Sequence, residues 1–328
     1  MNSTFIKPAT RNIAGKAAAG AFFHATSQKI KNIAPKPVSM RNLLLLLLLP
    51  AAFAAAADIG VYVINAGKFD PQSGSYSVDF YLSYKCDSPC EPNFEFTNGR
   101  AQSVDKIIDS PTEKFYRIQA NLQDPVDLRR YPFDSHNLTI EIEDKTETVD
   151  NLAYSANMEE SGMEPSIQFV GWKLKGWNAA VTEHYYPPYD ETYSNYVFTI
   201  ELERETLSAL LKIFAPVFFI MMLNFATHFL DPHLVPNRLI LHSSFMVATV
   251  MFHVAIGNQL PPLGYLTVAD KFMFAAYLPL AFSIASAIAV MELSEEKRDK
   301  DALRVHKLSR PASFAIWVAG IALVLLTM

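Results

Sequence analysis

The sequence predicts a two-part fold, a β-sandwich followed by a bundle of four transmembrane helices. Half of the 328 residues are hydrophobic and only 19% are charged, which is a high ratio for a water-soluble protein. The apolar residues concentrate in four long runs, at about 207–230, 236–257, 268–291 and 312–328, within a membrane part that covers 206–328. Residues 58–205 are instead polar, aromatic and alternating, as expected of a separate water-exposed domain.

The N-terminal residues divide into two segments ahead of the first strand. Residues 1–39 carry lysine and arginine but no acidic residue, and they fit either an over-extended start or an organelle transit segment. From Met40, one arginine, a leucine run and small residues resembling an A-x-A cleavage site predict a secretory signal peptide over 40–57. The mature chain should therefore begin near Ala57 or Asp58.

Six or more short strands are predicted between Ile59 and Arg204. Segments such as SYSVDFYLSY, NLTIEIE and YSNYVFTIELE alternate apolar and polar residues and are separated by Gly, Pro, Asn and Asp. This spacing makes a β-sandwich the simplest fold. The last strand runs into the first apolar run almost without a linker, so the two parts should be mechanically continuous.

Two cysteines, Cys86 and Cys90, flank a proline-containing turn. We expect a small disulfide if this part faces an oxidising compartment, with two free thiols as the alternative. A metal site needs more ligands than two thiols, and no others lie nearby in the sequence, so no metal is predicted.

Several functional classes are disfavoured by the sequence. The net charge is −5, and no basic patch is interleaved with stacking aromatic residues, so we expect no nucleic-acid partner. The sequence contains no zinc-protease HExxH motif, no nucleophile elbow and no phosphate-binding glycine loop. We therefore expect no enzyme activity, no catalytic residue and no cofactor.

The second apolar run is polar on more than one face, which a lipid-facing helix would avoid. At 100° per residue, His242, Thr249 and His253 share one face. A membrane helix with polar residues on two faces should be surrounded by other helices and by water, as a pore-lining helix is. The predicted pore-lining residues, on the opposite face, are Ile240, Ser244, Val247, Met251, Val254 and Asn258. His242 and His253 are candidates for pH sensing, although a structural role is the simpler interpretation.

The charges in the short loops predict the topology. SEEKRDKDALRVHKLSR follows the third run and is rich in lysine and arginine, which places it on the cytoplasmic side of a lipid bilayer. A cleaved signal peptide places the β-domain on the other side. We therefore expect a multi-pass plasma-membrane protein with an extracellular or periplasmic β-domain. If the source is prokaryotic, this membrane is the bacterial inner membrane.

Four further features lie in a fixed order along the chain. Tyr131-Pro132-Phe133-Asp134 stands between two strands, Arg204 directly precedes the first run, Pro216 lies within that run, and NQLPPLGYLT follows the second run. This pattern resembles the pentameric ligand-gated ion channels (Cys-loop receptors) over about residues 59–328. The cysteines that bracket the loop in animal members are absent, as in prokaryotic-type members.

The resemblance implies a homopentamer around an axial pore for inorganic ions, gated by a small-molecule agonist or by protons. Asp134 and Arg204 would pair near the membrane and couple the β-domain to the pore. The residues implied in coupling are Tyr131, Pro132, Phe133, Asp134, Arg204 and Pro261. A membrane-anchored ligand-binding sensor without conduction is the competing interpretation, but it does not explain a second run that is polar on two faces.

Aromatic residues between the last two strands occupy the place where the family covers its ligand. Aromatic faces attract ammonium groups through cation–π interactions. The candidate ligand-binding residues are Tyr185, Tyr186, Tyr189 and Tyr193, with Phe115, Tyr116 and Tyr154 as weaker candidates. Between Tyr84 and Asn93 this chain is several tens of residues shorter than the family pattern, which removes part of the usual pocket.

Residues at the two ends of the second run bear on ion selectivity. The cytoplasmic end is Pro236-Asn237-Arg238, without an acidic residue, and the outer end has neutral Asn258 and Gln259. Charged rings select ions by sign, so we expect weak selectivity with anion permeation. Asp231 is the nearby residue that could add negative charge at the inner end.

Overall fold

The protein was analysed as a computed structural model, which describes residues 55–231 and 234–328. The predicted extension 1–39 and the signal peptide up to residue 54 lie outside the described residues. Residues 55–57, which the sequence analysis assigned to the signal peptide, form the start of strand β1 and pair with β7.

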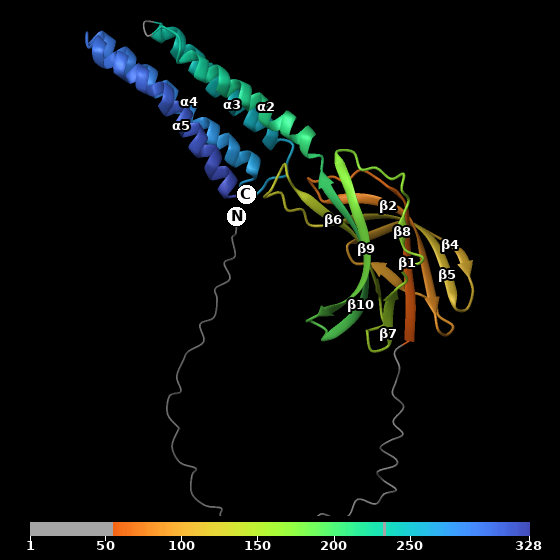
Figure 1. Cartoon of the computed structure of the whole chain (residues 1–328). Coiled ribbons are helices and arrows are strands. Elements are labelled where there is room, and N and C mark those ends of the chain that lie inside the picture. Colours follow the sequence, from red (N-terminus) through yellow and green to blue (C-terminus); the bar gives the residue numbers. More distant parts are fainter. Residues whose placement is uncertain (1–54, 232–233) are drawn as a thin grey trace, which may run out of the picture. The chain divides into compact units, whose positions relative to one another are not determined.

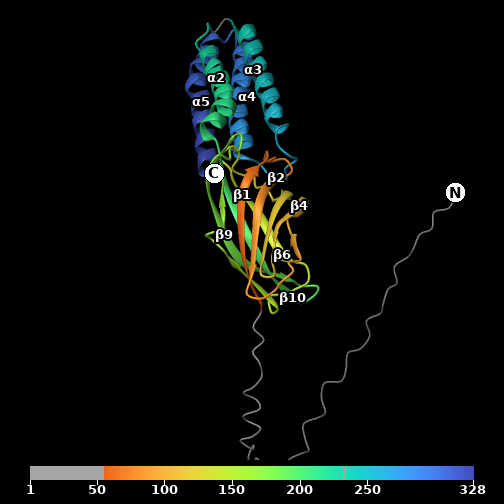
Figure 2. The same ribbon diagram turned by 90° about the vertical axis from the view of Figure 1, so that its right-hand side faces the viewer.

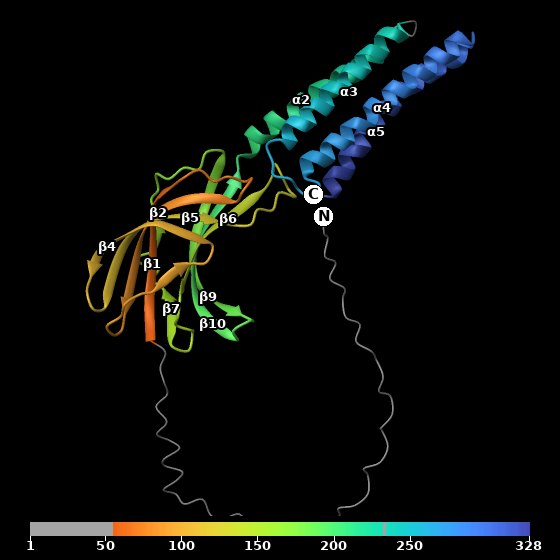
Figure 3. The ribbon, with the colours of Figure 1, turned by 180° about the vertical axis from the view of Figure 1, so that it is seen from behind.

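Two sheets form the β-domain (Figure 1). The order of the first sheet is β4 (Gly99–Asp109), β5 (Glu113–Gln123), β2 (Ser75–Cys86), β1 (Ala55–Ala66) and β7 (Leu152–Ala156), with β8 (Gly162–Met163) also paired to β1. The order of the second sheet is β3 (Phe94–Phe96), β6 (Ser135–Asp144), β10 (Glu191–Arg204) and β9 (Trp172–Tyr186). From behind, β4 and β9 lie at opposite sides of the domain (Figure 3).

The alternating residues of the strands meet between the two sheets. Ile59 and Phe80 from the first sheet and Ile140 and Phe198 from the second are fully buried in one core. Because successive side chains of a strand point to opposite faces, every second residue reaches this core and its neighbours face outward. The predicted β-sandwich is confirmed.

Four helices follow the sandwich and run side by side (Figure 2). They are α2 (Thr206–Thr227), α3 (Val235–Gly257), α4 (Val268–Glu295) and α5 (Asp299–Leu326). Each is long and apolar enough to cross a membrane, as the sequence predicted. α5 begins well before the fourth apolar run, because the charged segment is also helical. Asp299 and Asp301 lie in its first turn, where the helix dipole stabilises negative charge.

The loop between β5 and β6 contacts the start of α4 directly. The backbone N–H groups of Val268 and Ala269 donate to the carbonyl oxygens of Arg129 and Tyr131, each at 3.1 Å. These bonds use donors in the first turn of α4, which have no partner inside the helix. The loop that carries the YPFD sequence is therefore attached to the helical bundle through its backbone.

Candidate functional site

Asp134 and Arg204 form a bidentate ion pair. Arg204 Nε donates to Asp134 Oδ1 at 2.7 Å, and Nη2 donates to Oδ2 at 2.8 Å. The antiparallel register of β6 and β10 pairs Ser135 with Glu203, which brings the two residues opposite each other. The backbone N–H of Arg204 also donates to the carbonyl of Asp134 at 3.1 Å. The geometry is that of a fork-to-fork pair, the strongest arrangement for this residue combination.

Aromatic rings and a histidine enclose this ion pair. His136 Nε2 lies 2.7 Å from Asp134 Oδ2. The Arg204 guanidinium lies 4.2 Å from the ring centre of Trp172 and 5.0 Å from that of Tyr131. The side chain of Asp134 is only 1% exposed and that of Arg204 is 18% exposed. Removal of either charge would therefore leave the other buried without its main partner.

The pKa of Asp134 gives the pH range of this interaction. Burial alone would raise this pKa, but the hydrogen bonds from His136 and Arg204 and the Arg204 charge outweigh it and lower the pKa to about 2. A depressed carboxyl pKa adds stability above the unfolded-state value, and this stability is lost as the pH falls through the folded-state pKa. Asp134 thus remains ionised through mildly acidic conditions.

We expect the stability difference between the parent and Asp134→Asn to stay constant from about pH 7 to about pH 4. The difference should shrink between about pH 4 and about pH 2, as Asp134 becomes protonated in both folded and unfolded chains. Thermal unfolding of the full-length protein across this range measures it. A difference already lost at about pH 5 would contradict the ion pair as described.

The remaining loop residues contact the helices. The ring of Phe133 stacks on that of Phe214 in α2, with centres 5.8 Å apart, and Tyr131 lies in an apolar cluster with residues of α2, α3 and α4. Pro261, after α3, borders a surface hollow together with Pro125 and Val126. All six residues implied in coupling therefore lie in or next to the region between the sandwich and the helices.

The two faces of α3 differ in burial. The side opposite the predicted pore face is covered by the other helices, where His242 and Thr249 are fully buried. On the predicted pore face, Ile240, Val247, Met251 and Val254 each expose more than half of their surface in the single chain, and Ser244 and Asn258 are exposed too. The residues of the predicted pore face are thus all exposed in the single chain, as are Leu241 and Val250 beside them.

The histidines of α3 contact neighbouring helices. His242 Nδ1 lies 2.8 Å from Asn224 Oδ1 in α2. His253 Nε2 lies 2.9 Å from Asp270 Oδ1, and its Nδ1 lies 2.9 Å from the Tyr277 hydroxyl in α4. Both rings thus have hydrogen-bond partners on neighbouring helices.

The aromatic ligand candidates are dispersed. Tyr116 and Tyr154 are buried in the sandwich, and Phe115 stacks on Tyr81 on the outside of the first sheet. Tyr185 and Tyr189 are exposed on the β9–β10 hairpin. Tyr186 and Tyr193 meet edge to face, with ring centres 5.6 Å apart. Within the described chain these rings do not converge on one cage.

A hollow of about 820 Å³ lies beside Tyr186, between β3, β4 and the hairpin. Glu143 of β6, almost fully buried, holds this side of the hairpin: its carboxylate contacts His184 Nδ1 at 2.6 Å and accepts from the Tyr186 hydroxyl at 3.1 Å. Burial and the charge of Glu143 raise the pKa of Tyr186 to about 12. The sequence analysis missed Glu143, which gave no distinct signal because β6 alternates apolar residues with acidic and other polar ones.

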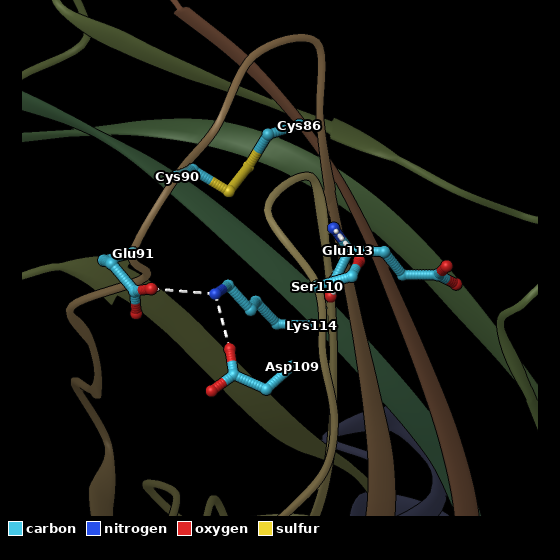
Figure 4. Close-up of a disulfide and its surroundings, with 7 residues drawn as sticks. All are labelled: Cys86, Cys90, Glu91, Asp109, Ser110, Glu113 and Lys114. Carbon is cyan, nitrogen blue, oxygen red and sulfur yellow. Dashed lines mark hydrogen bonds and ion pairs between the residues drawn. A yellow bond between two sulfur atoms is a disulfide. The ribbon is translucent and has the colours of Figure 1, made fainter.

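The disulfide between Cys86 and Cys90 is confirmed (Figure 4). The backbone N–H groups of Cys86 and Cys90 donate to the carbonyls of Thr112 and Pro111 in the β4–β5 turn, each at 2.9 Å. Below it, Lys114 is buried and its ammonium group binds Glu91 at 2.8 Å and Asp109 at 2.5 Å. The closed loop is thereby fixed to the adjacent hairpin just before β3 begins.

Comparisons with known proteins agree with this geometry. A proton-gated ion channel from Gloeobacter violaceus is 22% identical over 282 residues, which cover 78% of this chain and 78% of the relative. The human gamma-aminobutyric acid receptor subunit rho-3 is 21% identical over 199 residues, which cover 59% of this chain and 42% of that relative. No protein-family model matches the chain.

These relatives confirm the resemblance of the chain to the pentameric ligand-gated ion channels. Together with the four apolar helices, they define a multi-pass membrane protein with an extracellular β-domain. Neither relative is an enzyme, in agreement with the prediction that this chain is not one.

Proposed function

We propose that the chain is one subunit of a homopentameric ion channel that is gated by a small ligand or by protons. Five copies would place α3 around an axial pore for inorganic ions. The observation that carries the proposal is the exposed stripe of α3, which combines apolar residues with Ser244 and Asn258 while the opposite side is buried. A helix that only anchored the chain in lipid would not need polar residues on its exposed stripe.

In this proposal, the Asp134–Arg204 ion pair couples movement of the β-domain to movement of the membrane helices. Arg204 is the last residue of β10, and α2 begins two residues later, at Thr206. Asp134 lies in the loop whose backbone binds the start of α4. A displacement of the β-domain would therefore reach α2 through Arg204 and α4 through the loop, and both helices pack against α3.

A current measurement tests the proposal against the sensor alternative. We expect the purified protein in lipid bilayers to conduct when the pH is stepped or when small organic ligands are added. Pentamers that remain intact and silent under all of these conditions would favour a non-conducting sensor. The number of subunits can be counted in the same preparation by native mass spectrometry.

We expect weak ion selectivity with anion permeation. Arg238 is fully buried and its Nη1 lies 2.8 Å from His306 Nδ1, so its charge would be held behind the pore wall. The outer end of α3 carries the neutral side chains of Asn258 and Gln259, and rings without charge discriminate poorly by sign. Reversal potentials under a salt gradient measure this. A strongly cation-selective shift would contradict the prediction, and Asp231→Asn should then reduce that selectivity.

A further inference from the structure

A single carboxylate closes the base of the β5–β6 loop, residues 124–134. Asp124 Oδ2 accepts from the backbone N–H of Thr139 in β6 at 2.6 Å, and Oδ1 accepts from the Thr139 hydroxyl at 2.9 Å. β5 and β6 belong to different sheets, so no backbone ladder joins them. The two cysteines of the chain pair with each other, so no disulfide closes this loop. The side chain of Asp124 thus joins the two ends of the loop.

Two further side chains donate to Asp124. The Tyr76 hydroxyl, from β2 in the first sheet, donates to Oδ2 at 2.8 Å. Asn98, in the turn between β3 and β4, donates to Oδ1 at 3.0 Å and to the Thr139 carbonyl at 2.6 Å. Burial and the Asp124 charge raise the pKa of Tyr76, so its hydroxyl keeps the proton that it donates. Asp124 therefore receives hydrogen bonds from both sheets, and we call these four residues the Asp124 clamp.

The backbone of Asp124 is held by the turn between β1 and β2. Its N–H donates to the carbonyl of Gly74 at 3.0 Å. Gly74 has a φ of +73°, which residues with a side chain rarely adopt, and a Cβ at this position would collide with the Asp124 carbonyl oxygen. Asp124 is therefore seated closely against this turn.

Asp124 is buried without a cationic partner. Only 8% of its surface is exposed and, unlike Asp134, it takes part in no ion pair among the residues that the structure describes. A buried carboxylate is costly unless hydrogen bonds compensate it, and here neutral donors do so. An amide of the same shape has one acceptor oxygen, and its NH2 group would face one of these donors. The arrangement is therefore specific for a carboxylate.

We propose that Asp124 is a positioning residue, which makes the β5–β6 loop move with both sheets of the sandwich as one body. The carbonyls of Arg129 and Tyr131 in this loop accept from the first turn of α4, so a closed loop base holds these acceptors in place. A displacement of either sheet would then reach α4 through the Asp124 clamp, in addition to the route through the Asp134–Arg204 ion pair. Only this gating consequence rests on the proposed function, since the position of the loop is a property of the folded chain.

Hydrogen exchange of the Val268 and Ala269 amides reports on the position of the loop, because these amides donate to its carbonyls. In the purified full-length protein, Asp124→Asn should raise their exchange rates by about tenfold, since a hydrogen bond to a charged acceptor is lost at the loop base. Asp79→Asn is the matched control. Asp79, in β2, accepts from Arg117 of β5 at 3.1 and 2.8 Å within one sheet, and its replacement should leave these rates unchanged.

Thr139→Val removes one donor and keeps the backbone N–H, so it should raise the same rates less than Asp124→Asn does. Exchange in the core strands β1 and β10 should stay at the parent level. If Asp124→Asn loosens these strands too, Thr139→Val decides the test. Rates at Val268 and Ala269 that equal those of the parent in a folded variant would overturn the proposal.

Currents evoked by pH steps are recorded on the same variants. Asp124→Asn should move the pH of half-maximal current to more acidic values, because less of the displacement reaches α4, whereas Asp79→Asn should not. Faster exchange in Asp124→Asn without current in any variant would keep the positioning role and refute the channel. Currents in the parent with unchanged exchange in the variants would refute the positioning role alone.

Discussion

Replacing Asp134 with alanine should destabilise the full-length protein by about 3–5 kcal/mol, because the buried Arg204 charge would lose its bidentate partner. Arg204→Ala should cost less, since Asp134 keeps its contact with His136. In the double variant neither charge is left without the other, so its cost should fall well short of the sum of the two single costs. Chemical unfolding in detergent measures stability, and the ligand or proton response measures coupling.

A nearby ion pair provides the control for this cycle. Asp127 and Arg129 lie in the same loop with N and O atoms 2.7 Å apart, but both side chains are mostly exposed. Exposed pairs contribute about 0–1 kcal/mol, so Asp127→Ala should be nearly neutral. Additive effects of Asp134→Ala and Arg204→Ala would show that the buried pair does not act as a unit.

Replacing Val247 with serine should produce a channel that leaks or opens more easily. In the proposed pentamer Val247, Met251 and Val254 form stacked apolar rings, and a narrow apolar ring blocks ions by excluding water. A hydroxyl group at the first of these rings would stabilise water in the constriction and lower the free-energy barrier to ion passage. Resting conductance in the absence of ligand at neutral pH is the direct measurement.

Val318→Ser is the matched control for the gate. Val318 lies in α5 with about half of its surface exposed, so the same chemical change occurs in a helix outside the proposed pore. The resting conductance of this variant should equal that of the parent. If Val247→Ser also gates like the parent, the closed gate lies at another level of α3.

The sequence predicted the architecture because periodicity and hydropathy are local properties. Apolar and polar residues alternate in β5 and β10 because one face of each strand is buried. The four apolar runs likewise reflect helices that must cross a membrane. The Asp134–Arg204 contact was predicted from the resemblance, since 70 residues separate the two and no local pattern joins them. The predicted pore face of α3 rests on helical geometry alone, which places its residues on one side of the helix.

The positions of the aromatic ligand candidates were the least predictable part, because they depend on contacts across strands. Tyr116, Tyr154 and Tyr186 were all candidates because they are aromatic. In the structure, however, Tyr116 and Tyr154 are buried in the core, whereas Tyr186 borders the hollow. Glu143 belongs to no recognisable sequence motif. Its contacts with His184 and Tyr186 come from a neighbouring strand about 40 residues away, and no local sequence pattern predicts them.

The junction between β10 and α2 fixes the rotational phase of the first membrane helix. Glu205 alone separates Arg204 from Thr206, so the ion pair determines the angle at which α2 starts. The buried side of α2 contains Ile213, Val217 and Met221, spaced four residues apart. One inserted residue would turn that side by about 100° about the helix axis, given 3.6 residues per turn. The spacing at this junction can therefore change only together with the packing of the whole helix.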